Sequence, residues 1–91
     1  MSDAGQKRVS VEAIRAALAA QLGPTLLEVR DDSAAHAGHA GVREGGHFHV
    51  RIASSQFVDL TPIARHRLVY SALAGLMGRG IHALSIDALL P

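Results

Sequence analysis

The chain has 91 residues, which is enough for one domain with a single core. Hydrophobic residues make up 48% of it and aromatic residues only 3%, so we expect a core packed from aliphatic side chains. Nine lysines and arginines against eight aspartates and glutamates give a net charge of +1, too weak to indicate nucleic-acid binding by itself.

The chain contains no cysteine, which limits the kinds of metal site and cross-link that it can form. This absence excludes disulfides, and it excludes a zinc finger or an all-cysteine iron–sulfur site held by this chain alone. No apolar run approaches the roughly 20 residues of a membrane span, so we predict a cytoplasmic chain without a membrane partner. No nucleophile, paired carboxylates or phosphate-binding loop stands out, and we do not expect an enzyme.

The N-terminal part predicts a tail, a helix and a strand. Residues 1–8 are small and polar and predict a disordered tail, which leaves 9–91 as the folded domain. Ser10 is a helix N-cap, and the apolar residues after it recur at spacings of three and four, as in an amphipathic helix: Val11, Ile14, Leu18 and Leu22. Residues 27–30 alternate apolar with charged, which predicts a half-buried strand.

A glycine-rich segment separates this strand from the next. Residues 34–46 contain four glycines and two histidines with no helical or strand period, and loops of this length are usually functional or mobile. Residues 47–53 then alternate, with Phe48, Val50 and Ile52 on one face. A glycine-rich loop between two such strands predicts a hairpin.

The C-terminal part predicts a second helix and a third strand. Thr61 and Pro62 are a strong helix start, and an apolar stripe continues from there until Gly78. Residues 81–89 form the final strand, in which His82 shares one face with Leu84, Ile86 and Ala88. The order αββαβ predicts an α+β domain with two helices covering one face of a three-stranded sheet.

Several short motifs occur in one order with compact spacing. They are Leu27-Glu28-Val29, Ser33 followed by His36, His47-Phe48, Ser54-Ser55-Gln56-Phe57, Arg65-His66-Arg67-Leu68-Val69-Tyr70 and Ile81-His82-Ala83-Leu84. Together they resemble the BolA family, from the first helix to Pro91. The resemblance implies the same αββαβ order, with a topology akin to class II KH domains. One departure is Asp59, which stands where the family commonly has a glycine in the turn after the phenylalanine.

All six histidines fall between positions 36 and 82, and a neutral imidazole is a common metal ligand. Strand parity places His82 on the apolar face, where a histidine bonded to a backbone carbonyl is the ordinary interpretation. Its place at the start of the strand, beside the break at Gly78–Gly80, allows it instead to reach outward. The resemblance implies that His82 is the principal iron–sulfur ligand.

The resemblance also implies a second ligand from the loop between the first two strands. His36 matches that position best, and His47, which ends the loop and points away from the core, is the alternative. We expect His39 to be a solvated loop histidine and His49 to lie on the exposed face of the sheet.

The implied function is coordination of a two-iron two-sulfur (2Fe-2S) cluster shared with a monothiol glutaredoxin and its glutathione, in cluster assembly, trafficking or iron regulation. Two imidazoles can replace two thiolates on one iron, so a partner must bring the other ligands, and the isolated chain holds no cofactor. The alternative is a DNA-binding transcriptional regulator that uses Arg65, His66 and Arg67. His66 is also a candidate for holding the helix to the sheet. A weak homodimer stays open.

Overall fold

The structure, a computed structural model, describes residues 9–33 and 46–91. The predicted tail 1–8 and most of the predicted loop, including His36 and His39, lie outside the described residues. The predicted αββαβ order is confirmed, with one short 3-10 helix (η3) added: α1 is Val11–Leu22, β1 Leu26–Asp31, β2 Gly46–Ala53, η3 Ser55–Phe57, α2 Pro62–Ala72 and β3 Ile81–Leu89.

The two helices begin at the residues predicted from the sequence. The Ser10 hydroxyl accepts a hydrogen bond from the backbone N–H of Ala13, and the Thr61 hydroxyl accepts one from the N–H of Ala64. Helix α1 ends at Gly23, whose positive φ of 51° is accessible to glycine at little cost.

Helix α2 is shorter than its apolar stripe predicted. It ends at Ala72, and a series of turns carries the chain from Leu73 to Gly80. The Leu73 N–H bonds to the carbonyls of both Val69 and Tyr70, which tightens the last turn, and Gly78 and Gly80 then adopt positive φ. Leu73 is still fully buried. The apolar stripe therefore predicted the burial of Leu73 correctly, although its prediction of a longer helix was wrong.

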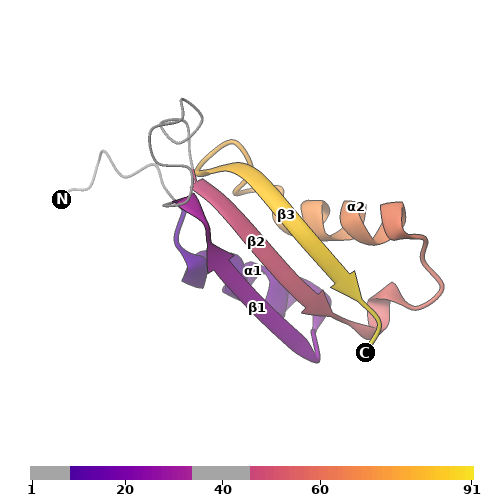
Figure 1. Cartoon of the computed structure of the whole chain (residues 1–91). Helices are drawn as coiled ribbons and strands as arrows, with labels where there is room; N and C mark the ends of the chain where they lie inside the picture. Colours follow the sequence, from indigo (N-terminus) through magenta and orange to yellow (C-terminus); the bar gives the residue numbers. More distant parts are fainter. Residues whose placement is uncertain (1–8, 34–45) are drawn as a thin grey trace.

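The sheet has the strand order β1-β2-β3 and is mixed. Strands β1 and β2 are antiparallel, as the predicted hairpin requires, whereas β2 and β3 are parallel because α2 connects them. Both helices lie on one side of the sheet (Figure 1). There, side chains of α1, of α2 and of Leu73, which follows α2, pack on the buried face of β2: Ile14, Leu18, Val69 and Leu73 with Phe48, Val50 and Ile52.

Three helix side chains also reach the two outer strands. The Arg15 guanidinium of α1 donates to the carbonyl of Leu27 in β1 at 3.1 Å. From α2, the Tyr70 hydroxyl donates to the carbonyl of Leu84 and the Arg65 guanidinium to that of Ala88, each at 3.4 Å. The helices therefore contact the margins of the sheet as well as its face.

Candidate metal centre

A β-bulge determines the position of His82. Gly46 of β2 pairs with Ile81 of β3, but the next residue, His47, pairs with Ala83, so His82 is an extra residue in its strand. Ile81 is buried, and the next residue that packs on the core is Leu84, three positions on instead of two. His82 is exposed. The prediction that His82 shares the face of Leu84, Ile86 and Ala88 is therefore wrong, and His82 is not a core histidine.

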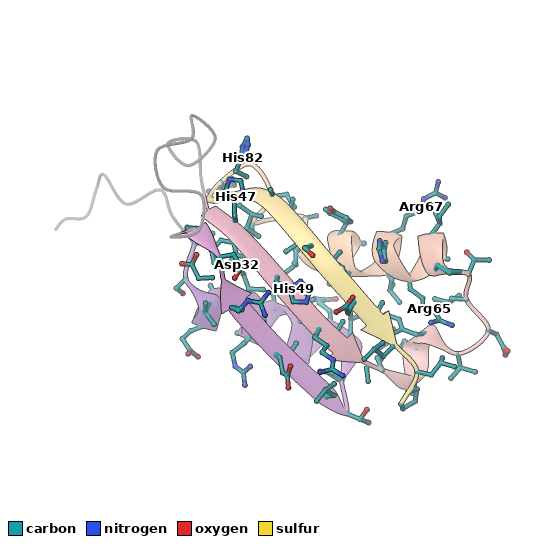
Figure 2. The ribbon with its side chains drawn as sticks, in the orientation of Figure 1. Asp32, His47, His49, Arg65, Arg67 and His82 are labelled. Atoms are coloured by element: carbon teal, nitrogen blue, oxygen red, sulfur yellow. The ribbon has the colours of Figure 1, made fainter. Side chains whose placement is uncertain are left out.

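The bulge places His82 beside His47. The His47 side chain lies on the face of the sheet opposite to the buried Phe48, as predicted, and is half-buried, with its Nε2 atom enclosed. The ring centroids of His47 and His82 are 5.3 Å apart and the rings are tilted by 47°. Figure 2 shows both rings at the same end of the sheet.

This separation suits two ligands of one metal ion. With metal–nitrogen bonds of about 2.1 Å, two imidazoles in neighbouring coordination positions have centroids roughly 5 Å apart. Within residues 9–33 and 46–91, no three histidine or carboxylate groups are clustered closely enough to hold a metal ion. The spacing of the two rings thus allows them to occupy two positions on one metal ion, and the described residues place no third histidine or carboxylate group with them.

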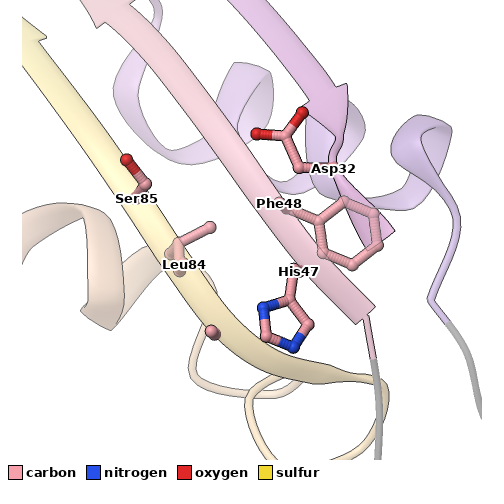
Figure 3. A pocket seen from close by; sticks show the side chains of 6 residues that line it. Asp32, His47, Phe48, Leu84 and Ser85 are labelled. Carbon is pink, nitrogen blue, oxygen red and sulfur yellow. The ribbon is translucent and has the colours of Figure 1, made fainter. Parts of the chain in front are cut away.

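The backbone of His47 is fixed on both sides. Its carbonyl accepts from the N–H of Asp32 at 2.7 Å, and its N–H donates to the Ser33 hydroxyl at 3.0 Å. A pocket of about 220 Å³ lies beside the His47 ring (Figure 3), lined by Asp32, His47, Phe48, Ala83, Leu84 and Ser85. The site thus combines a held backbone, two adjacent rings and free volume.

His49 lies on the outer face of the sheet, as predicted, but both of its ring nitrogens have contacts. Its Nδ1 is 2.9 Å from the Ser85 hydroxyl, and its Nε2 is 3.3 Å from a carboxylate oxygen of Asp87. These contacts hold His49 within the sheet surface, two residues along β2 from His47. We therefore do not include it in the candidate centre.

The three residues predicted to contact nucleic acid do not form one surface. Arg65 is half-buried, with its Nε donating to the carbonyl of Leu60 at 3.2 Å and another nitrogen to that of Ala88. His66 and Arg67 are exposed, and Figure 2 shows Arg67 projecting away from the sheet. The contact between helix and sheet that we considered for His66 is made by Arg65 instead, a role that sequence spacing did not suggest.

Within the described ranges, no helix is long and apolar enough to cross a membrane. This agrees with the absence of a long apolar run in the sequence.

Comparisons with known proteins give a consistent result. A family model described as BolA-like protein matches residues 18–91. The human BolA-like protein 1 is 46% identical over 79 residues, which are 87% of this chain but 56% of that protein, so the chain spans little more than half the length of this relative. The DNA-binding transcriptional regulator BolA of Vibrio cholerae is 37% identical over 82% of this chain and 69% of that protein.

A solved structure agrees with both sequence matches. The BolA domain of SufE1 from Arabidopsis thaliana is 44% identical and has a TM-score of 0.79, covering 89% of this chain and 91% of that one. The family suggested by the sequence motifs is therefore confirmed, and this chain belongs to the BolA family.

Proposed function

We propose that this chain supplies two imidazole ligands to a 2Fe-2S cluster that it shares with a monothiol glutaredoxin, in cluster assembly, trafficking or iron regulation. The observation that supports this best is the His47–His82 pair, whose rings lie 5.3 Å apart in a chain without cysteine. His82 is the first ligand. The second is His47 or His36, of which only His47 is among the described residues.

The chemistry of the donor set explains the need for a partner. Iron–sulfur clusters are usually held by thiolates, but two imidazoles can replace two of them on one iron, which raises the reduction potential. This chain has no cysteine and therefore no thiolate to offer, so the glutaredoxin cysteine and glutathione must supply the sulfur ligands. The residues of this chain orient the two rings and keep their spacing.

Co-expression with a monothiol glutaredoxin tests the proposal directly. We expect a purified complex with the visible absorption and circular dichroism of a cluster with mixed nitrogen and sulfur ligands. His82→Ala should abolish the histidine-dependent spectrum while the fold persists, since His82 is exposed at a bulge. His49→Ala is the matched control, because it removes a neighbouring imidazole that has other contacts.

Two further variants identify the second ligand. If His47 is the ligand, His47→Ala should shorten the lifetime of the cluster more than His36→Ala does; the reverse order assigns the role to His36. If the His82→Ala complex has unchanged circular dichroism and an unchanged cluster lifetime, His82 is not a ligand and the proposal fails.

DNA binding is the second candidate function, supported by the name of the Vibrio cholerae relative and by the exposed Arg67 of α2. Replacing both Arg65 and Arg67 with Ala should weaken duplex binding and lower its salt dependence by up to roughly two units. Because the Arg65 guanidinium already donates to two carbonyls, we expect most of this effect from Arg67. Equal affinities for wild type and variant at two salt concentrations would exclude Arg65 and Arg67 from DNA binding.

The cytoplasmic location and a weak homodimer stay predictions.

A further inference from the structure

We propose that Ser33 is a positioning residue that holds His47 in place beside His82. This inference rests on the proposed function, because it assigns to Ser33 the orientation of one imidazole of the candidate metal centre. Sequence analysis singled out Ser33 only as part of a family motif, and its role comes from contacts that join residues 14 positions apart.

The Ser33 hydroxyl connects the end of β1 to the start of β2. Ser33 is one of two buried polar residues in the described part of the chain, with 6% of its surface exposed. Its hydroxyl oxygen accepts the N–H of His47 at 3.0 Å, while its own N–H donates to a carboxylate oxygen of Asp31 at 2.8 Å. Together with the Asp32–His47 backbone bond, these contacts fix the end of β1 to the start of β2.

Little space is left next to this contact. Gly46 is buried, and a Cβ atom built on it would overlap the Phe48 ring and lie 3.2 Å from the Ser33 hydroxyl oxygen. The Gly46 N–H also donates to the carbonyl of Gly80 at 2.8 Å, just before β3 begins. The residue before His47 is thus packed between the first strand and the bulged strand, and Ser33 forms one wall of that packing.

The position of the His47 backbone determines where its imidazole lies relative to that of His82. His47 is the first residue of β2 after the change of register that leaves His82 as the extra residue, so a shift of the His47 backbone changes the spacing of the two rings. Ser33 acts on the backbone of His47 and does not touch a metal. Groups that bond directly to a ligating side chain typically alter metal affinity by about 10- to 100-fold when they are removed, and for a contact with the backbone of a ligand we expect an effect at the lower end of that range.

The chain supplies a matched control in Ser54. Ser54 is also buried, and its hydroxyl donates to the carbonyl of Leu22 at 2.7 Å and accepts from the N–H of Gln56. It follows the last residue of β2, at the opposite end from His47. Ser33→Ala and Ser54→Ala therefore remove the same group from the same kind of environment at the two ends of one strand.

The test compares the complex of full chain and glutaredoxin for wild type, Ser33→Ala, Ser33→Thr and Ser54→Ala, after amide spectra have verified each fold. We expect Ser33→Ala to shorten the half-life of the bound cluster by about tenfold and to change its visible circular dichroism. Ser33→Thr retains the hydroxyl and should restore both, whereas Ser54→Ala should lower thermal stability without changing the spectrum. Indistinguishable cluster spectra and half-lives for Ser33→Ala and Ser54→Ala would overturn the inference.

A second readout uses the free chain and needs no cluster. Nuclear Overhauser contacts between the ring protons of His47 and His82 should be present in wild type and Ser54→Ala and be lost or weakened in Ser33→Ala. If the wild-type complex holds no cluster, the proposed function fails, while these ring contacts still decide the role of Ser33. If Ser33→Ala does not fold, Ser33→Thr decides: the inference requires that it keep the ring contacts, and their loss in a folded Thr variant contradicts it.

Discussion

Both ends of β2 are held by hydrogen bonds, but only one of them places two histidine side chains next to each other. At the Ala53 end, the carbonyl of Ala53 accepts from the N–H of Thr25, and the N–H of Ser54 donates to the carbonyl of Leu89. The Ser54 hydroxyl joins this end to α1, and Arg65 joins the neighbouring strand to α2. Backbone and side-chain hydrogen bonds thus connect both helices and all three strands near this end, so the Ala53 end acts as the anchor of the sheet.

At the Gly46 end the strand is held equally closely, but the register slips and leaves an imidazole from each of two strands side by side. A buried serine stabilises each end: Ser54 at the anchor and Ser33 at the histidine pair. Rigid backbone contacts and an exposed histidine are therefore compatible at one strand end, because a bulge turns one side chain outward without loosening the strand beside it.

The largest expected effect tests how tightly the histidine end is packed. Gly46→Ala should lower the free energy of unfolding by about 1–3 kcal/mol, because the added methyl would overlap the Phe48 ring. Gly75→Ala is the control, since a Cβ there meets nothing within 4 Å, and it should change stability by less than about 0.5 kcal/mol. Urea denaturation of both variants measures the difference, and equal values would show that the histidine end is loosely packed.

The anchor end should respond next most strongly. Ser54→Ala leaves the buried carbonyl of Leu22 without its donor at 2.7 Å, for which we expect a loss of about 1–2 kcal/mol. Ser55→Ala changes an exposed serine one residue on and serves as the reference. Thermal unfolding measures the difference between Ser54→Ala and Ser55→Ala. Equal midpoints for the two variants would contradict the anchor role of Ser54.

The two arginines of α2 should contribute differently to stability, because Arg65 bonds to the anchor end and Arg67 lies on the exposed surface of the helix. Arg65→Ala removes donors to two carbonyls at a half-buried position and should cost about 1 kcal/mol. Arg67→Ala should cost less than about 0.5 kcal/mol, because Arg67 is exposed. The denaturant midpoints of both variants in one buffer measure this difference. A larger loss of stability for Arg67→Ala than for Arg65→Ala would show that Arg65 is not the arginine that stabilises the fold.

The smallest expected effect is a gain in stability. Asp59, in the turn before α2, has a φ of 68°, which glycine adopts at less cost than any other residue. Asp59→Gly should therefore stabilise the chain by about 0.5 kcal/mol, after the entropy of a more flexible unfolded chain is counted. A calorimetric scan can detect the shift, and a clear loss of stability would mean that the Asp59 side chain stabilises the turn.

Much of the fold could be predicted because its signals are local. Ser10, Thr61 and Pro62 mark helix starts, and the alternation of residues 47–53 marks the buried face of β2. Asp59 takes the positive φ expected of the glycine that it replaces, so the turn survives the departure from the family pattern.

The site could be predicted only in part. Strand parity failed for His82 because a period of two has no place for an inserted residue, although the apolar pair Ile81 and Leu84, three positions apart, was a usable signal of a bulge. The contacts of Ser33 with His47 and of Arg65 with Ala88 join residues 14 and 23 positions apart. No local pattern encodes such contacts, since the first depends on how β1 and β2 pair and the second on how α2 packs against β3.

The helix side chains that reach β1 and β3 bear on how the molecule meets other chains. An outer strand presents backbone groups to which a further strand can bond, which is a common route to aggregation. Here the carbonyls of Leu27, Leu84 and Ala88 already accept from Arg15, Tyr70 and Arg65. Addition of a strand at either margin would have to displace these donors, so the side chains of the two helices oppose edge-to-edge pairing at both outer strands.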